Sequence, residues 1–113
     1  MEAISDFTWM RDLRIGRVLE RFDFEDYRVV AVSVPSTEER PLNQFHFRLL
    51  FFPKNANRPV LALNLESSIL GSYCLTEQSG GRHLNVGRAQ ESMSYGEFKQ
   101  WALTQAQQDL VNV

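Results

Sequence analysis

The chain has 113 residues, the size of one compact domain, and we expect a single domain over residues 1–113. Hydrophobic residues make up 43% of the chain and aromatic residues 12%, which is enough for a buried core and argues against disorder. A formal net charge of −2 gives no general attraction to nucleic acids or anionic membranes, so neither is expected as a partner.

The cysteine content and the first residues point to a reducing compartment. A single cysteine, Cys74, can form neither an internal disulfide nor a cysteine-rich zinc site. The opening stretch MEAISDFTWMRD contains Glu2 and Asp6 and lacks the apolar core of a signal peptide. The longest apolar run, Leu49 to Pro53, is far shorter than the roughly 20 residues of a membrane-spanning helix. We therefore expect a cytoplasmic protein without a membrane anchor.

The N-terminal segment has helical periodicity that later gives way to a strand pattern. Apolar residues between Ile4 and Leu13 recur every third position, which predicts an N-terminal helix. Helical spacing continues to Phe22, although Gly16 costs a helix up to about 1 kcal/mol relative to alanine. Residues 21–34, RFDFEDYRVVAVSV, are rich in aromatic and β-branched side chains and predict a strand. The boundary between helix and strand stays open between Leu13 and Phe22.

The middle of the chain predicts a loop followed by a hairpin. Two prolines and several charges between Pro35 and Pro41 indicate an exposed loop. The stretch FHFRLLFF, residues 45–52, is apolar on both faces at its end and predicts a central strand. The stretch VLALNL, residues 60–65, follows the turn PKNANRP, so we expect an antiparallel hairpin.

A second hairpin is predicted around Gly80 and Gly81, because glycine supplies the positive φ that a two-residue hairpin turn needs. This register separates apolar from polar side chains on its two faces, which supports it. The register pairs three positions across the turn: Thr76 with Asn85, Leu75 with Val86, and Glu77 with Leu84.

The same register tests whether Cys74 and His83 form a nucleophile and base. They lie four residues apart along the hairpin, roughly 13 Å at about 3.3 Å per residue. A thiolate and its base need to be within about 3 Å. We therefore predict no catalytic dyad and no catalytic residue. No spacing typical of a metal, phosphate or nucleotide site surrounds His46, His83 or the glycines, so no cofactor is expected.

The C-terminal segment predicts a second helix. Ser94 and Glu97 have the spacing of a capping box. Apolar residues then recur every fourth position from Phe98 to Leu110, with Trp101 beside them, as in an amphipathic helix that packs on a sheet. The expected fold is α+β: an antiparallel sheet of four or five strands with the N-terminal and C-terminal helices on one face.

Two groups of charged residues favour solvated surface over a functional site. On one continuous helix, Arg11, Arg14, Arg17 and Arg21 would form a basic stripe, but neighbouring acids neutralise it and no nucleic-acid motif surrounds it. The adjacent carboxylates Glu25 with Asp26, and Glu38 with Glu39, fall in predicted turns or loops.

The most informative feature is the sheet face that the two helices would leave open. It combines polar groups with apolar residues, and an uncovered apolar patch favours association with another protein. The first hypothesis is a non-enzymatic interaction module, with a symmetric homodimer as the simplest form. The alternative is a small-molecule pocket around His46, Arg48, Glu66 and His83, with or without catalysis. The ligand or partner face comprises His46, Arg48, Leu50, Phe52, Asn64, Glu66, Thr76, His83 and Asn85.

Overall fold

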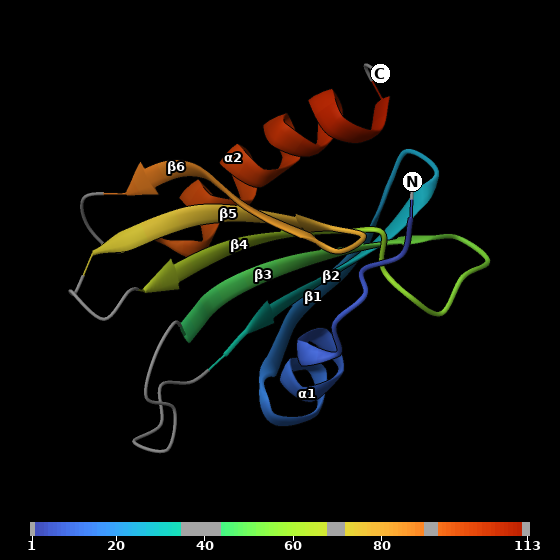
Figure 1. Ribbon diagram of the computed structural model, residues 1–113, viewed down its shortest axis with the longest axis horizontal. Coiled ribbons are helices and arrows are strands. Elements are labelled where there is room, and N and C mark those ends of the chain that lie inside the picture. Colours follow the sequence, from blue (N-terminus) through green and yellow to red (C-terminus); the bar gives the residue numbers. More distant parts are fainter. Residues whose placement is uncertain (1, 35–43, 68–71, 90–92, 112–113) are drawn as a thin grey trace.

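The computed structural model describes residues 2–34, 44–67, 72–89 and 93–111 (Figure 1). These residues form six strands in a single sheet whose spatial order follows the chain, each strand pairing antiparallel with the next. The elements are α1 (Thr8–Ile15), β1 (Arg17–Phe24), β2 (Tyr27–Ser33), β3 (Gln44–Pro53), β4 (Leu61–Ser67), β5 (Tyr73–Ser79), β6 (Arg82–Ala89), α2 (Tyr95–Ala106) and the π-helical turn η1 (Gln107–Val111).

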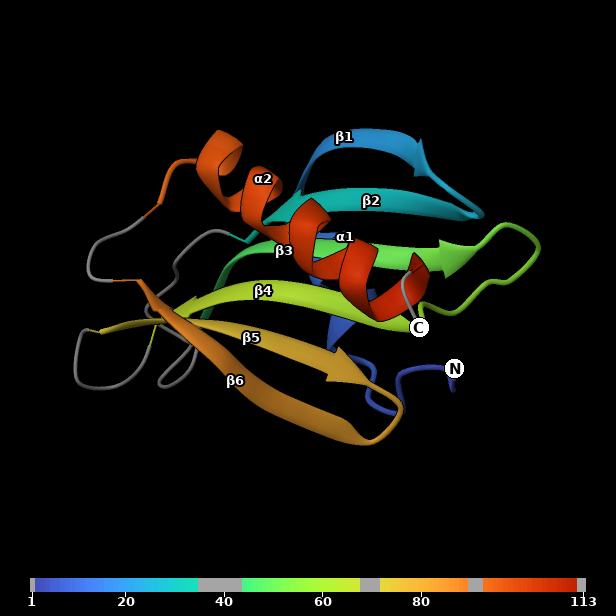
Figure 2. The same cartoon turned by 90° about the horizontal axis from the view of Figure 1, so that it is seen from above.

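The α+β class is confirmed, whereas the predicted strand number and helix placement are wrong. The sheet has six strands, not four or five. The helices lie on opposite faces, α2 above the sheet and α1 below it in Figure 1, and Figure 2 shows the sheet from the α2 side. The physical reason is that both faces of the central strands are apolar, so each face needs its own cover.

The strand number was underestimated because two turns in the first third of the chain were missed. The helix ends at Gly16, where a Cβ atom would lie 2.5 Å from the backbone oxygen of Asp12 and 2.8 Å from that of Ser33. The segment up to Phe22, for which helical spacing was noted, is therefore part of strand β1. The single strand predicted over residues 21–34 is split by a turn at Glu25, whose φ of 51° is left-handed.

The α2 face holds the larger apolar core, and the prediction of an amphipathic C-terminal helix is confirmed. Ser94 caps α2, and Glu97 completes the capping box. Phe98, Ala102 and Ala106 are fully buried against the inward side chains of β2 to β5, and the Phe98 ring stacks on Phe47 with 5.8 Å between centroids. The helix therefore contributes directly to the core.

The opposite face was expected to be uncovered, and this expectation is wrong. Leu50 is fully buried and Phe52 nearly so, because Trp9 of α1 packs edge-on against the Phe52 ring at 5.7 Å between centroids. The segment before α1 is tied down as well, since the backbone N–H of Ile4 donates to the oxygen of Pro59 at 2.9 Å. The physical basis for a homodimer through Leu50 and Phe52 is thereby removed.

Both predicted hairpins form, with local shifts in register. The central position of β3 and its pairing with β4 are confirmed. In the β5–β6 hairpin Thr76 pairs with Asn85 as predicted, but a bulge places Leu75 opposite Gly87 instead of Val86. Another bulge after Phe45 moves that ring to the α1 face. The loop predicted over residues 35–41 lies outside the described residues.

Candidate functional site

A network of buried polar side chains lies between α1 and the sheet. Arg48, on the central strand β3, is fully buried, and its guanidinium donates to Asp12 Oδ2 at 2.7 Å and to Asn64 Oδ1 at 2.9 Å. It also donates to Thr8 Oγ1 at 3.1 Å and to Gln78 Oε1. Burial lowers the pKa of Arg48, and the hydrogen bond and charge of Asp12 oppose that effect. The guanidinium is thus a charged group held inside the protein.

The network continues across the sheet. Gln78 Nε2 donates to Asp6 Oδ2 at 2.7 Å, and Asn64 Nδ2 donates to Thr76 Oγ1 at 3.2 Å. The Arg48 guanidinium lies over the Phe45 ring, with 3.9 Å between Arg48 Cζ and the ring centroid. Because Arg48 is fully buried and donates four hydrogen bonds to protein groups, this cluster fastens α1 to the sheet and leaves Arg48 inaccessible to a ligand.

The pocket residues expected around Arg48 separate into different environments. Glu66 is nearly buried and its Oε2 lies 2.8 Å from His83 Nε2, whereas the His83 side chain is about half exposed. His46 instead contacts the Tyr73 ring, with 5.2 Å between centroids, and its buried Nε2 has no partner among the described residues. Burial lowers the pKa of His46, which favours the neutral ring. Arg48, Glu66 and His46 therefore serve different local contacts.

The remaining predicted site residues are distributed between the core and the surface. Asn64 and Thr76 belong to the buried network, and Asn85 lies exposed on the edge strand β6. Cys74 pairs with Arg88, and His83 pairs with Gln78, four residues further along β5. This register supports the expected separation of Cys74 and His83, roughly 13 Å along the strand.

Sequence reasoning missed four members of the network: Asp6, Thr8, Asp12 and Gln78. Asp12 was assigned to the neutralisation of nearby arginines on a solvated surface, yet its side chain is fully buried. One available signal was the four-residue spacing of Thr8 and Asp12, which places both on the same side of a helix. The other was Arg48 itself, since an arginine within a central strand needs a buried carboxylate.

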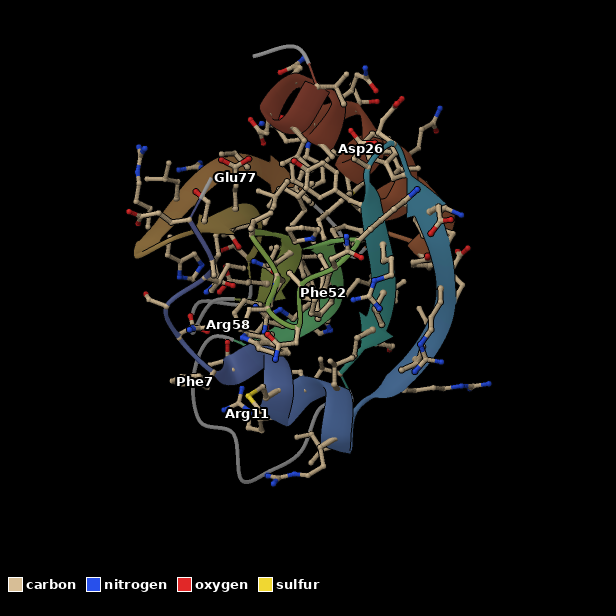
Figure 3. The ribbon with its side chains drawn as sticks, turned by 90° about the vertical axis from the view of Figure 1, so that its right-hand side faces the viewer. Phe7, Arg11, Asp26, Phe52, Arg58 and Glu77 are labelled. Carbon is tan, nitrogen blue, oxygen red and sulfur yellow. The ribbon has the colours of Figure 1, made fainter. Side chains whose placement is uncertain are left out.

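The outward side of α1 exposes large apolar residues among arginines. Phe7 is 61% exposed and Met10 is 52% exposed. Arg11 and Arg14 follow Phe7 by four and seven residues and fall on the same side of the helix as Met10. The Arg58 guanidinium lies 5.2 Å from the centre of the Phe7 ring. Figure 3 shows Arg58, Phe7 and Arg11 beside α1, on the far side of the sheet from α2.

We call Phe7, Met10, Arg11 and Arg14, together with Arg58, the α1 outer stripe. It differs from the basic stripe considered in the sequence, because α1 ends at Ile15 and both Arg17 and Arg21 belong to β1. The only carboxylate within α1 is that of Asp12, which is buried, binds Arg48 through Oδ2 and lies 3.3 Å from Arg11 Nε through Oδ1, so that one carboxylate is shared by two arginines. The stripe is consequently cationic and partly apolar.

A pair of carboxyl groups lies on the α2 side of the sheet. Glu77 on β5 faces η1, where its carboxyl interacts with that of Asp109. Its buried Oε1 has no donor among the described residues. Burial, followed by the hydrogen bond and charge of Asp109, raises the pKa of Glu77 to about 7. Two carboxyl groups can share a hydrogen bond only while one of them keeps a proton.

Two further observations concern metals and membranes. Among residues 2–34, 44–67, 72–89 and 93–111, no group of three or more His, Cys, Asp or Glu side chains is arranged to hold a metal ion. Over the same residues, neither α1 nor α2 has the length and apolar character required to cross a lipid bilayer.

Comparisons with known proteins do not assign the chain to a family. No protein-family model, curated protein sequence or solved structure matches the chain. Function is therefore inferred from the geometry of the described residues.

Proposed function

We propose that the protein is a non-enzymatic interaction module that binds an acidic, partly apolar segment of another protein through the α1 outer stripe. The observation that supports this most strongly is the exposure of Met10, and of Phe7 at the N-cap, on the outer side of a helix whose inner side is fastened to the sheet. Such side chains bury apolar area when a partner docks, and aromatic residues, methionine and arginine are enriched at protein interfaces.

The charge of the stripe selects the chemistry of the partner. Arg14 and Arg58 present positive groups, and Arg11 adds a third whose Nε lies 3.3 Å from Asp12 Oδ1, while Asp12 itself is buried against Arg48. An acidic partner complements these charges, whereas two copies of the stripe placed face to face would bring arginines together. A heterologous partner is therefore favoured over the symmetric homodimer considered for the sheet face.

The rigidity of α1 supports the same function. Its inner side is held by the buried pair Arg48–Asp12 and by the Trp9 contact with Phe52. A surface that is already ordered loses little conformational freedom when it binds, so more of the contact energy appears as affinity. The network around Arg48 has a role in this proposal as the support of the binding surface.

A peptide titration tests the proposal. The probe is a fluorescein-labelled helical peptide with glutamates on one side and leucines on the other, and its lysine counterpart serves as the control ligand. We expect fluorescence anisotropy to show saturable binding of the acidic peptide only. Added salt should weaken this binding, because the charges lie at the surface.

Matched variants locate the binding surface. Phe7→Ser and Met10→Ser should each weaken binding by about tenfold, as residues at the centre of an interface do. Leu84→Ser removes a comparably exposed apolar side chain from β6 and should leave binding unchanged. Equal binding of both peptides, or an equal effect of all three substitutions, would contradict the proposal. Far-UV circular dichroism of each variant checks that the fold is retained.

A further inference from the structure

A hollow of about 480 Å³ lies at the open end of the β5–β6 hairpin, remote from the turn at Gly80. This volume falls within the range of small-molecule sites, about 300 to 1,000 Å³. Cys74, Asn85 and Arg88 of its lining belong to the α1 face of the sheet, because Leu75 and Val86 beside them point into the core under α2. The lining residues are Ser72, Tyr73, Cys74, Asn85, Arg88 and Ala89.

The polar groups of the hollow are mainly hydrogen-bond donors. Arg88 is exposed and forms no ion pair with any residue that the structure describes. Asn85 Oδ1 already accepts from the backbone N–H of Gly87 at 3.2 Å, so the side-chain NH₂ group, with its two donors, is the end that remains for a ligand. A permanent positive charge beside amide donors favours an anion.

Among the described residues, no acid forms an ion pair with Arg88. Glu66, opposite Cys74 on the neighbouring strand, is nearly buried and is engaged by His83 at 2.8 Å. A second hollow, of about 350 Å³, differs in this respect, because Asp23 lines it together with Arg21 and Arg28. Of these two hollows, the first is thus the one whose arginine has no carboxylate beside it in the lining that the structure describes.

We infer that this hollow binds a small organic anion, with the Arg88 guanidinium as the main anchor and the Asn85 amide as a second donor. The anionic group is a carboxylate or a phosphate, since both accept paired hydrogen bonds from a guanidinium. Tyr73 and Ala89 also border the hollow, although both pack against the core under α2. The inference is independent of the α1 outer stripe, which uses different residues.

Cys74 offers a direct readout because it is the only cysteine of the chain and lines the hollow. The experiment measures the rate at which an uncharged maleimide labels Cys74. The rate is recorded at increasing concentrations of sodium phosphate and, in a separate series, of sodium benzoate. Sodium chloride at the same ionic strength is the control. We expect at least one of the two anions to slow labelling several-fold in a saturable manner. The anion that protects identifies the preferred group, and protection by both assigns a general anion site.

Two arginine variants of β6 make the test specific. Arg88→Gln should raise the half-protecting concentration about tenfold or more, because it removes the charged donor. Arg82→Gln removes the exposed arginine at the other end of the same strand and should leave that concentration unchanged. Backbone amide NMR shifts at Asn85 and Arg88 provide a second measurement that does not depend on the thiol.

Two results would overturn the inference. The first is a labelling rate of Cys74 that sodium chloride lowers as much as phosphate and benzoate do, with no change in the amide shifts of Asn85 and Arg88. The other is protection that is the same in wild type and Arg88→Gln while circular dichroism shows both proteins folded. Because the peptide titration reports on a different surface, failure here leaves the proposal for the α1 outer stripe to its own test.

Discussion

Replacing Glu77 by glutamine should stabilise the protein at neutral pH and alter how its stability depends on pH. The pKa of Glu77 is raised from 4.5 to about 7, so the folded state binds a proton that the unfolded state has already released. Stability from this group is fully present below pH 4.5 and is lost as pH rises to about 7. Glutamine keeps the shape and offers a donor to Asp109 without ionising.

The magnitude follows from the difference in pKa between the two states. The difference between 4.5 and about 7, at about 1.4 kcal/mol per pKa unit, gives an upper limit of about 3 to 4 kcal/mol. Solvent reaches part of the Glu77 side chain, and the resulting screening reduces the expected effect to about 1 kcal/mol. We compare the free energy of unfolding of Glu77→Gln with that of wild type at each pH. The gain of the variant over wild type should be about 1 kcal/mol larger at pH 8 than at pH 4.5.

Urea denaturation at pH 4.5, 6 and 8 measures this difference. Subtracting the free energy of unfolding of wild type from that of the variant removes the contributions of groups that both proteins share. Asp109→Asn should reproduce the effect in part, because it removes the second carboxylate. Asp23→Asn, at an exposed carboxylate of β1, is the control and should show no such trend. A difference between Glu77→Gln and wild type that is constant across pH would refute the reasoning.

Three further predictions concern stability. Asp12→Ala leaves the buried Arg48 charge without its carboxylate and should lower the free energy of unfolding by about 3 to 5 kcal/mol. Asp12→Leu combined with Arg48→Met removes both charges and should lower it clearly less, as measured by the same urea titration. Gly16→Ala should lower the thermal midpoint, because its Cβ would meet two backbone oxygens within 3 Å; an unchanged midpoint would mean that the chain relaxes there without cost. Phe98→Ala should cost about 3 to 5 kcal/mol, with Trp101→Ala, only partly buried, costing less; the reverse order in urea midpoints would contradict the packing of α2.

Much of the fold could be predicted where the pattern was local. The central strand β3 is recognisable because apolar residues occupy both of its faces, and Ser94 and Glu97 mark the start of α2 three residues apart. The turn at Gly80 also determines the register of β5 and β6 in the residue pairs next to it. These features depend on residues close together in the chain, where spacing and side-chain type are sufficient.

The errors concern contacts between distant parts of the chain. Helical spacing up to Phe22 gave no warning that Gly16 sits against the backbone of Ser33, which ends the helix. Because only two helices were predicted, both were expected on one face of the sheet and the other face was expected to stay open. The spacing of apolar residues within a helix does not specify which face of the sheet that helix covers. As a result the exposure of Leu50 and Phe52 was predicted wrongly.

The candidate site was only partly accessible for the same reason. Arg48 was recognised as a polar residue on an important face, but its partners Asp12 and Gln78 are 36 and 30 residues away in the chain. Their contact exists only once α1 has packed on the sheet. The α1 outer stripe was likewise hidden, since Phe7 and Met10 were assigned to the helical apolar pattern and prove to be the exposed members of it.

The most direct test of the proposed function is an amide NMR titration of the labelled protein with the unlabelled acidic helical peptide. We predict that shift changes concentrate on residues 7 to 14 and around Arg58, with those of the β1 and β6 edges unaffected. Met10→Ser should reduce these changes at the same peptide concentration. Shift changes centred on another surface, or none at peptide concentrations that saturate the anisotropy signal, would contradict the assignment of the α1 outer stripe as the binding surface.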